Sequence, residues 1–442
     1  MSDNPVRVRL VKRPMSSSYP YQFYELAHAA LAPARAVSDA TNFVFRNPWN
    51  PLSNTYLGKN ISAGAELFER ITRRYGKPAF RLDDTEIDGV VYPVLEDIVW
   101  TKPFCNLIRF RRPDFAGEAS QPKLLIVAPM SGHYATLLRG TVEAFLPYFD
   151  VHITDWADAR MVPLAVGSFD LDDYIDYLRE IFTCLGPGAH AIAVCQPSVP
   201  LLAAVALMEA DGDRNLPASM TLMGGPVDTR RSPTEVNKLA EKRGVEWFRR
   251  NCLHTVPFPY PGFGREVYPG FLQLSGFMAM NIDRHVTAHL DMFKHLVAGD
   301  EDPVEKLREF YDEYLAVMDL TAEYYMQTIE TVFVRHALPK GEMRSRGRLV
   351  DLSAIRHCGL LTVEGEKDDI SGVGQTRAAI ELCVNIPETR KQYYLAEGVG
   401  HYGVFNGSRF RKGIAPRIRE FIAGIEASAK AGKPNGAGRQ GR

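Results

Sequence analysis

Short apolar runs that alternate with helical patterns are the feature that most constrains how this chain can fold. The clearest helix is predicted over residues 171–185, where apolar side chains recur with the period of an α-helix. Asp170 can cap its start, and Gly186-Pro187-Gly188 ends it. Strands are predicted at residues 123–128, 151–156, 190–194, 218–223, 360–363 and 392–395. Such repeated strand–helix units predict an α/β protein built on a doubly wound, mostly parallel sheet.

The strand patterns also divide the chain into regions. Between the fourth and fifth strands the periodicity is largely helical, which indicates a helical cap inserted into the sheet domain. The end of the chain consists mainly of Ala, Gly, Lys, Arg and Pro, so it offers too little apolar area to offset chain entropy. The expected regions are a flexible N-terminal extension (1–18), a mostly helical N-terminal region (19–110), the first part of the core (111–225), the helical cap (226–350), the second part of the core (351–426) and a disordered tail (427–442).

Charge and composition exclude several classes of function. Lys plus Arg number 52 and Asp plus Glu number 53, and the resulting net charge of −1 offers no electrostatic footprint for nucleic acid. The six cysteines are scattered without a CxxC pair, which favours reduced thiols and a cytoplasmic location. The N-terminus lacks the apolar core of a signal peptide, and prolines interrupt the most apolar stretch at residues 189–208. We therefore expect neither export nor a transmembrane anchor.

The junction Ala193-Val194-Cys195-Gln196-Pro197 is the most informative local motif. It places a cysteine on the turn between a predicted strand and a predicted helix, as in the nucleophile turn of the α/β-hydrolase fold. Ala193 and Pro197 stand where that turn usually has glycines, and Cys195 stands in place of serine. Since most free cysteines are small buried apolar residues, Cys195 needs partners to qualify as a nucleophile.

An acid and a histidine follow Cys195 in the order that this fold requires, each in a loop after a late strand. Asp368 is the preferred acid, with Asp369 and then Glu366 as alternatives, and His401 is the candidate base. The competing interpretations are that the acidic loop is merely solvated and that His401 only caps the final helix. The order of Cys195, Asp368 and His401 favours a catalytic triad.

Backbone N–H groups that stabilise an oxyanion are expected at two places in such a site. Gln196, directly after the candidate nucleophile, would supply the first, and Met130 or Ser131 in the loop after residues 123–128 would supply the second. Ser131 could instead be a serine nucleophile beside His133. The turn around Ser131 lacks the strand–turn–helix pattern, so we prefer Cys195.

Three histidines in the cap raise the question of a metal. His285 and His289 would share a helical face, and His295 lies nearby. No carboxylate motif of the H-E-x-x-H type accompanies them, and an ordinary exposed face is the preferred interpretation. We predict no metal site.

Longer motifs connect the chain to a known family. They are Tyr24–Pro33, Asn50-Pro51-Leu52, Gly64–Arg70, Arg73–Pro78, Ala193–Pro197 and Val399–Gly403. With these motifs the chain resembles the intracellular polyhydroxyalkanoate depolymerases, which mobilise stored poly(3-hydroxybutyrate) granules in bacteria. The resemblance covers residues 21–425 and implies the α/β-hydrolase fold with a helical cap and a helical N-terminal region.

The resemblance implies a mechanism and a substrate. Cys195 would be the nucleophile, His401 the base and Asp368 its partner, and the reaction would pass through an acyl thioester. Water as the acceptor would release hydroxyacid monomers or oligomers, whereas coenzyme A would give a 3-hydroxyacyl-CoA. The residues require no other cofactor, because a triad and an oxyanion hole suffice for acyl transfer.

The implied partner is the surface of a polyhydroxyalkanoate granule, so we expect a cytoplasmic, granule-associated protein that can form oligomers. Apolar side chains of the opening helices are candidates for docking on the granule, namely Phe23, Leu26, Leu31, Phe43 and Phe45. The simpler interpretation is that these side chains pack against the sheet domain. The alternative functions are a polyester synthase, a non-catalytic granule-binding protein and a general esterase.

Overall fold

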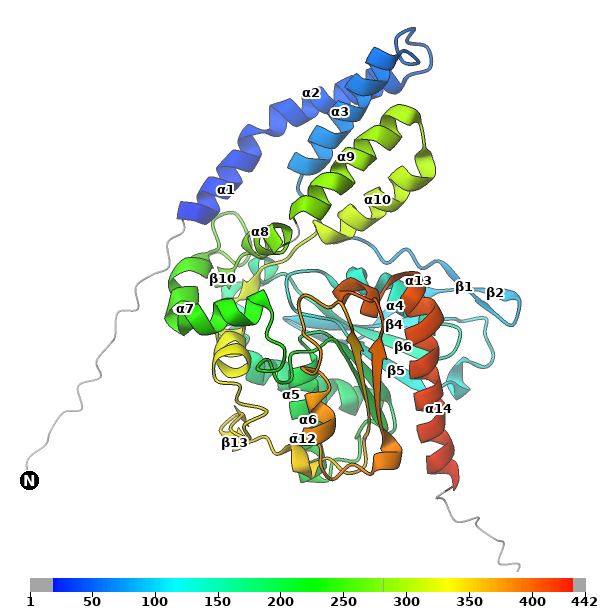
Figure 1. Ribbon diagram of the computed structural model, residues 1–442, viewed down its shortest axis with the longest axis vertical. Helices are drawn as coiled ribbons and strands as arrows, with labels where there is room; N and C mark the ends of the chain where they lie inside the picture. The colour runs from blue at the N-terminus through cyan, green and yellow to red at the C-terminus, as the bar shows by residue number, and fades with distance from the viewer. Residues whose placement is uncertain (1–18, 281, 432–442) are drawn as a thin grey trace, which may run out of the picture.

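The computed structural model describes residues 19–280 and 282–431, and its central element is an eight-stranded sheet (Figure 1). The strand order is β15-β14-β8-β7-β5-β6-β4-β3. All neighbours from β6 to β15 are parallel, whereas β4 is antiparallel to both β3 and β6. The strands are β3 (Leu95–Lys102), β4 (Cys105–Arg111), β5 (Lys123–Val127), β6 (Asp150–Trp156), β7 (His190–Val194), β8 (Ser219–Met223), β14 (Gly359–Gly365) and β15 (Lys391–Ala396).

Helices cover both faces of this sheet, which explains why its central strands are continuous apolar runs. Every residue of β7, β8 and β14 is buried, as expected for parallel strands between two helical layers. In Figure 1, α5 (Leu171–Leu185) and α6 (Ser198–Asp211) lie on one side and α14 (Ala415–Ala431) lies on the other. The predicted doubly wound, mostly parallel sheet is therefore confirmed.

Helix α5 illustrates how local sequence specifies these elements. The Asp170 side chain accepts a hydrogen bond from the Asp173 N–H, and the Asp173 side chain accepts one from the Asp170 N–H, which completes a capping box. Gly186, at φ +79°, ends the helix in a conformation that favours glycine. The apolar face of the helix is buried, at Leu171, Tyr174, Ile175, Leu178, Ile181, Phe182 and Leu185.

The N-terminal region departs from the expectation of a mostly helical segment to residue 110. Its helices α1 (Tyr19–Ala30), α2 (Ala32–Arg46) and α3 (Tyr56–Thr72) end well before that point. A hairpin, β1 (Asp84–Ile87) with β2 (Val90–Pro93), follows them. Strands β3 and β4 then enter the main sheet, so the core begins earlier than predicted. Because β3 is an edge strand with no buried residue, it lacks the apolar pattern that identifies a strand.

The chain between β8 and β14 forms the cap and part of a second helical unit. The cap contains α7 (Glu235–Cys252), α8 (Gly270–Met280), α11 (Ala322–Thr328) and a small sheet of β9 (His254–Thr255), β10 (Glu266–Tyr268) and β11 (Leu320–Thr321). Helices α9 (Ile282–Ala298) and α10 (Glu301–Tyr314) instead pack against α3, whose other side contacts α2 (Figure 1). Together α1, α2, α3, α9 and α10 form a helical arm that projects from the rest of the molecule.

Ion pairs hold the two parts of the helical arm together. Arg70 of α3 lies 2.6 Å from the Asp312 carboxylate of α10, and Arg308 of α10 lies 2.7 Å from the Glu66 carboxylate of α3. Glu66 and Arg70 are both buried. Segments far apart in the sequence thus share one helical unit.

The C-terminal helix is longer than the sequence predicts. Helix α14 runs to Ala431, into the segment that the sequence predicts as a disordered tail. The helix continues into this segment because the alanines there are strong helix formers. The rest of that tail and the predicted N-terminal extension lie outside the described residues. No helix within the described ranges is long and apolar enough to cross a membrane.

Candidate active site

Cys195 lies on a sharp turn between β7 and α6. Its φ is +66°, a left-handed conformation that is unusual for a residue other than glycine. The turn is held by two backbone hydrogen bonds, from the Cys195 N–H to the Met223 carbonyl at 2.7 Å and from the Ser198 N–H to the Cys195 carbonyl at 3.1 Å. This strand–turn–helix geometry presents a half-buried thiol at the carboxyl edge of the sheet.

Glycines from the neighbouring strand make room for this turn. A Cβ on Gly225 would lie 2.0 Å from Ser198 Oγ and 2.8 Å from the Cys195 carbonyl oxygen. Gly224, at φ +57°, faces the other partners, because its Cβ would lie 3.2 Å from Asp368 Oδ2. In the usual motif, glycines on either side of the nucleophile let the turn approach the neighbouring strand closely. Here the two glycines that follow β8 leave that space instead. Sequence analysis missed this pair, although Gly224-Gly225 directly follows a predicted strand.

Asp368 and His401 meet at the same edge of the sheet. His401 Nδ1 and Asp368 Oδ2 are 2.8 Å apart, and both side chains are buried. The other carboxylate oxygen of Asp368 accepts hydrogen bonds from the Ile370 N–H at 2.9 Å and the Ser371 N–H at 2.8 Å. Glu366, an alternative acid, instead accepts from the Gly398 N–H and is exposed. The geometry therefore joins His401 to Asp368.

The electrostatics of this pair favour a charged histidine. Burial lowers the pKa of His401. The Asp368 carboxylate, the Cys195 sulfur and hydrogen bonds to both raise this pKa by more than burial lowers it, so the net pKa is well above its ordinary value. A raised pKa stabilises an imidazolium beside the sulfur. The arrangement can therefore support a thiolate–imidazolium pair, which is the reactive form of a catalytic cysteine.

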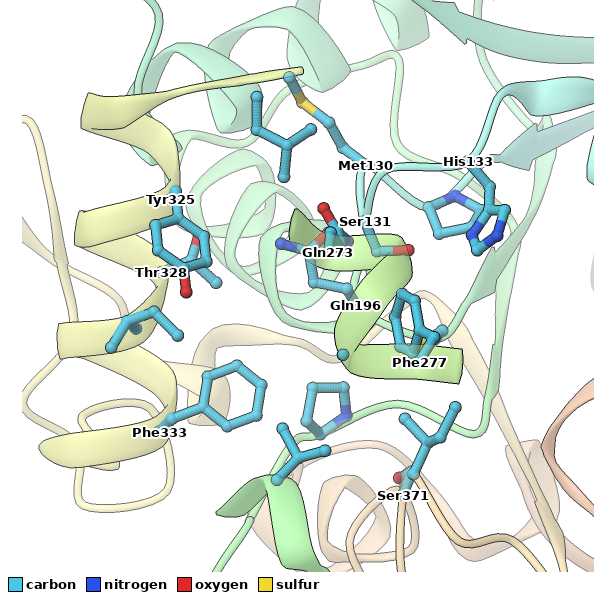
Figure 2. Close-up of a pocket in the computed structure, with 18 of the residues that line it drawn as sticks. Met130, Ser131, His133, Gln196, Gln273, Phe277, Tyr325, Thr328, Phe333 and Ser371 are labelled. Carbon is cyan, nitrogen blue, oxygen red and sulfur yellow. The ribbon is translucent and has the colours of Figure 1, made fainter. Parts of the chain in front are cut away.

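The candidate oxyanion donors line the same pocket as Cys195 and His401. Met130 and Ser131 come from the loop after β5, and Gln196 starts the turn into α6. The loop is attached to the base of the cap, since the Met318 N–H donates to the Gly132 carbonyl at 2.7 Å. Figure 2 shows Tyr325, Thr328 and Phe333 on one side of this pocket, and His133 and Phe277 on the other.

Ser131 lacks the surroundings of a nucleophile. It does not lie at a strand–helix turn, and the nearby His133 contacts the end of α10, with its Nε2 3.1 Å from the Tyr314 carbonyl oxygen. Burial lowers the pKa of His133 to about 4, which the bond to Tyr314 opposes. The local geometry therefore favours Cys195 over Ser131.

The pocket above Cys195 is an apolar cavity of about 360 Å³. Its walls come from the sheet domain and from cap helices α7, α8 and α11, continued by the π-helical turn η5 (Ile329–Val334). Most of the lining side chains are aliphatic or aromatic, with a few polar groups among them. Such a cavity suits a substrate that is mainly hydrocarbon.

The three histidines that were considered as metal ligands lie on α9 of the helical arm, and each has another partner. His285 Nδ1 lies 3.1 Å from the Tyr311 hydroxyl, His289 Nδ1 lies 2.7 Å from the His285 carbonyl, and His295 Nδ1 lies 3.1 Å from an Asp300 oxygen. Among residues 19–280 and 282–431, no group of three or more potential ligands could hold a metal ion. The six cysteines, all within these ranges, are free thiols.

The strand order, the antiparallel second strand and the cap inserted after β8 are those of an α/β-hydrolase. Residues 224–426 match the family model described as "PHB de-polymerase C-terminus". This stretch is just under half of the chain, and it is similar to the C-terminal domain of poly(3-hydroxybutyrate) depolymerases, which supports a carboxylic ester hydrolase.

Solved structures with similar folds are distant in sequence. A serine hydrolase from Cycloclasticus zankles is 15% identical, with 75% of this chain and 99% of that chain covered at a TM-score of 0.40. A carboxylesterase from Nitrososphaera gargenis is 13% identical, with 76% and 100% covered at 0.39. The hydrolase BphD from Rhodococcus sp. strain RHA1 is 10% identical, with 75% and 99% covered at 0.39. Among curated proteins, nothing matches the chain.

Proposed function

We propose that the protein is an intracellular depolymerase that cleaves the ester bonds of stored poly(3-hydroxybutyrate) or a related polyhydroxyalkanoate. Cys195 is the nucleophile and His401 is the base. Asp368 orients the His401 ring and stabilises its protonated form. The observation that carries the proposal is the strained turn at Cys195, which lines one pocket with His401, the hydrogen-bond partner of Asp368. The depolymerase domain over residues 224–426 supports a polyester as the substrate.

The first half of the reaction forms an acyl-enzyme. His401 takes the proton from Cys195 Sγ, and the thiolate attacks the carbonyl carbon of a polymer ester. The N–H of Gln196 and that of Met130 or Ser131 stabilise the oxyanion. When the intermediate collapses, the C–O bond breaks, and His401 returns its proton to the leaving alkoxide. The products are a polymer end with a free hydroxyl and a 3-hydroxyacyl thioester on Cys195.

The second half transfers the acyl group to an acceptor. His401 removes a proton from water, the hydroxide attacks the thioester carbonyl, and the Cys195 thiolate leaves and regains its proton. The product is a 3-hydroxyacid monomer or oligomer. Coenzyme A in the place of water would release a 3-hydroxyacyl-CoA by the same steps. Water is the acceptor that we propose, because it needs no binding site of its own.

The helical arm is the proposed contact with the polymer granule. Its exposed apolar side chains include Phe23, Phe43, Trp49 and Tyr56, and Trp49 is 93% exposed. Of the side chains predicted to dock, Leu26 and Leu31 are also exposed, whereas Phe45 is half-buried. Exposed apolar surface of this extent is typical of an interaction site. This proposal places the protein in the cytoplasm, at the surface of the granules.

Release of 3-hydroxybutyrate from protein-free amorphous granules tests the proposed function. We expect product from the native chain and almost none from Cys195→Ala. Cys184→Ala is the matched control, because Cys184 is an exposed thiol on α5, and it should retain full activity. Parallel reactions with and without coenzyme A identify the acceptor.

Three outcomes would contradict the proposal. Activity in Cys195→Ala would exclude this cysteine as the nucleophile. Binding of granules without product from the native chain would favour a non-catalytic binding protein. Release of coenzyme A from 3-hydroxybutyryl-CoA with growth of the polymer would favour a polyester synthase.

A further inference from the structure

Two buried hydroxyl groups in the pocket lack a well-formed hydrogen bond. Tyr324 and Thr328 lie one turn apart on α11, and their side chains are 1% and 5% exposed. Neither hydroxyl makes a hydrogen bond of good geometry, and the nearby Oε1 of Gln196 lacks one as well. Buried polar atoms are nearly always paired in proteins, so a cluster of unpaired ones at a candidate active site points to a ligand.

The three side chains form one group close to the nucleophile. The Tyr324 hydroxyl is within interaction range of the Gln196 and Thr328 side chains and of the Cys195 sulfur. Burial raises the pKa of this hydroxyl, the neighbouring Gln196 and Thr328 side chains oppose the rise, and Cys195 adds to it. Tyr324 therefore stays a neutral hydroxyl that can donate a hydrogen bond.

Apolar side chains line the same pocket as this group. They are Leu239 and Ala240 of α7, Phe248 further along α7, and Ile329 and Phe333 of η5. A plain fatty-acyl chain would cover these side chains but would leave the hydroxyls unpaired, at a cost in binding. The matching ligand is mainly hydrocarbon and carries an oxygen close to the carbon that Cys195 attacks.

We propose that Tyr324 and Thr328, assisted by the Gln196 amide, bind the oxygen on C3 of the acyl group that is transferred to Cys195. This inference rests on the proposed function and adds a specificity site to it. In a 3-hydroxyalkanoate polyester, C3 lies two bonds beyond the attacked carbonyl carbon. Its oxygen is an ester oxygen within the chain and a free hydroxyl at a chain end. Both can accept a hydrogen bond from Tyr324, so the site distinguishes 3-oxygenated acyl groups from plain ones.

Matched soluble esters test this specificity without a polymer. The substrates are p-nitrophenyl butyrate and the two enantiomers of p-nitrophenyl 3-hydroxybutyrate, which differ only at C3. We expect Tyr324→Phe to lower kcat/KM for the preferred 3-hydroxybutyrate enantiomer roughly tenfold and to leave butyrate nearly unchanged. Thr328→Val should act in the same direction. In both variants, the ratio of kcat/KM between the enantiomers should fall towards one.

Tyr325→Phe is the matched control. Tyr325 directly follows Tyr324 on α11, but its hydroxyl interacts with Cys252 and Tyr268. Its removal should change hydrolysis of the three esters alike, and their ratios should stay constant. Binding of 3-hydroxybutyrate and of butyrate to Cys195→Ala, with and without Tyr324→Phe, gives the same comparison without turnover.

The outcomes separate this inference from the proposed function. If the native chain cleaves neither the esters nor the polymer, the proposed function fails. If the native chain is active through Cys195 but Tyr324→Phe and Thr328→Val lower all three esters equally, the C3 site is wrong. Thermal unfolding of each variant shows whether a loss of activity reflects a loss of folded protein.

Discussion

At Cys195, contacts with β8 hold the backbone at φ +66°, and glycines after that strand leave the necessary space. A left-handed conformation costs a non-glycine residue about 1–3 kcal/mol, so the surrounding structure must impose it. Gly225 has no Cβ to collide with Ser198. The strain serves a purpose, because it separates the thiol from the strand and directs it towards the pocket.

Asp368→Asn should reduce activity and change its pH dependence. Loss of the carboxylate removes the charge that raises the pKa of His401, although burial still lowers it. We expect kcat on soluble esters to fall by roughly 10²- to 10⁴-fold. The titration of His401 should move to lower pH, visible as a shift of the pH–rate profile in the same direction.

The same substitution makes a prediction for stability. A histidine whose folded pKa is raised stabilises the fold fully below its unfolded pKa, and this contribution is lost as pH rises through the folded pKa. The native chain should therefore exceed Asp368→Asn in stability most near pH 6 and least in alkaline solution. Urea unfolding at several pH values measures the difference. A gap that widened as pH rose would contradict the assigned ion pair.

At the scale of elements, a buried polar cluster joins α1, the cap and the loop after β6. The Tyr21 hydroxyl of α1 donates to Asp319 at 2.6 Å, and the N–H of Gly270, at the start of α8, donates to the other oxygen of Asp319 at 2.9 Å. The Asp319 N–H in turn donates to Asp158, whose carboxylate pairs with Arg160. Three segments distant in sequence are thereby fixed to one another.

Asp319→Asn should flatten the acid side of the stability profile. Burial, followed by the nearby Asp158, raises the pKa of Asp319 to about 7, while Arg160 and hydrogen bonds from Tyr21 and Gly270 oppose the rise. Because the folded chain holds this proton more tightly than the unfolded chain, Asp319 makes stability decrease as pH rises from about 4 to about 7. Asparagine resembles the protonated acid and does not titrate. Thermal unfolding across this range should therefore vary less in the variant, and an unchanged slope would refute the assignment.

At the scale of the whole molecule, the chain separates a sheet domain that carries the candidate site from a helical arm that carries exposed apolar side chains (Figure 1). The proposed polymer substrate would require both parts, because an enzyme that acts on an insoluble particle must adsorb to its surface and then admit one chain to the pocket. The base of the cap connects the two parts, through α10 and the segment that bonds to the loop at Gly132.

Serine substitutions at Phe43, Trp49 and Tyr56 should weaken binding to granules. Each removes a large exposed apolar side chain whose burial on the polymer would contribute about 2 kcal/mol. Co-sedimentation with amorphous granules should fall several-fold, while hydrolysis of p-nitrophenyl esters stays the same. Val384→Ser, at an exposed apolar position of the sheet domain, is the control. The outcome that contradicts this prediction is normal binding to granules by the serine variants. If light scattering then showed that the native chain is a dimer and the variants are monomers, the arm would be a self-association surface.

Sequence patterns predict the elements in which burial is local. The periodicity of α5 and the apolar runs of β7, β8 and β14 specify their own structure, since each buries one stripe or both faces. Strand β3 escapes prediction because its burial is not patterned, and α14 is longer than its apolar residues indicate. Local patterns therefore describe the core better than its edges.

The order of strands and loops along the chain also carries Cys195, Asp368 and His401 to one edge, because the carboxyl ends of parallel strands meet there. Tertiary structure alone decides that Gly225 faces Ser198, that α9 and α10 join α3, and that Tyr324 and Thr328 are buried without well-formed hydrogen bonds. The first two relations join residues that are far apart in sequence. The third depends on which other elements pack against α11. No local period records them, because a period reports that a side chain is buried and does not report which residue buries it.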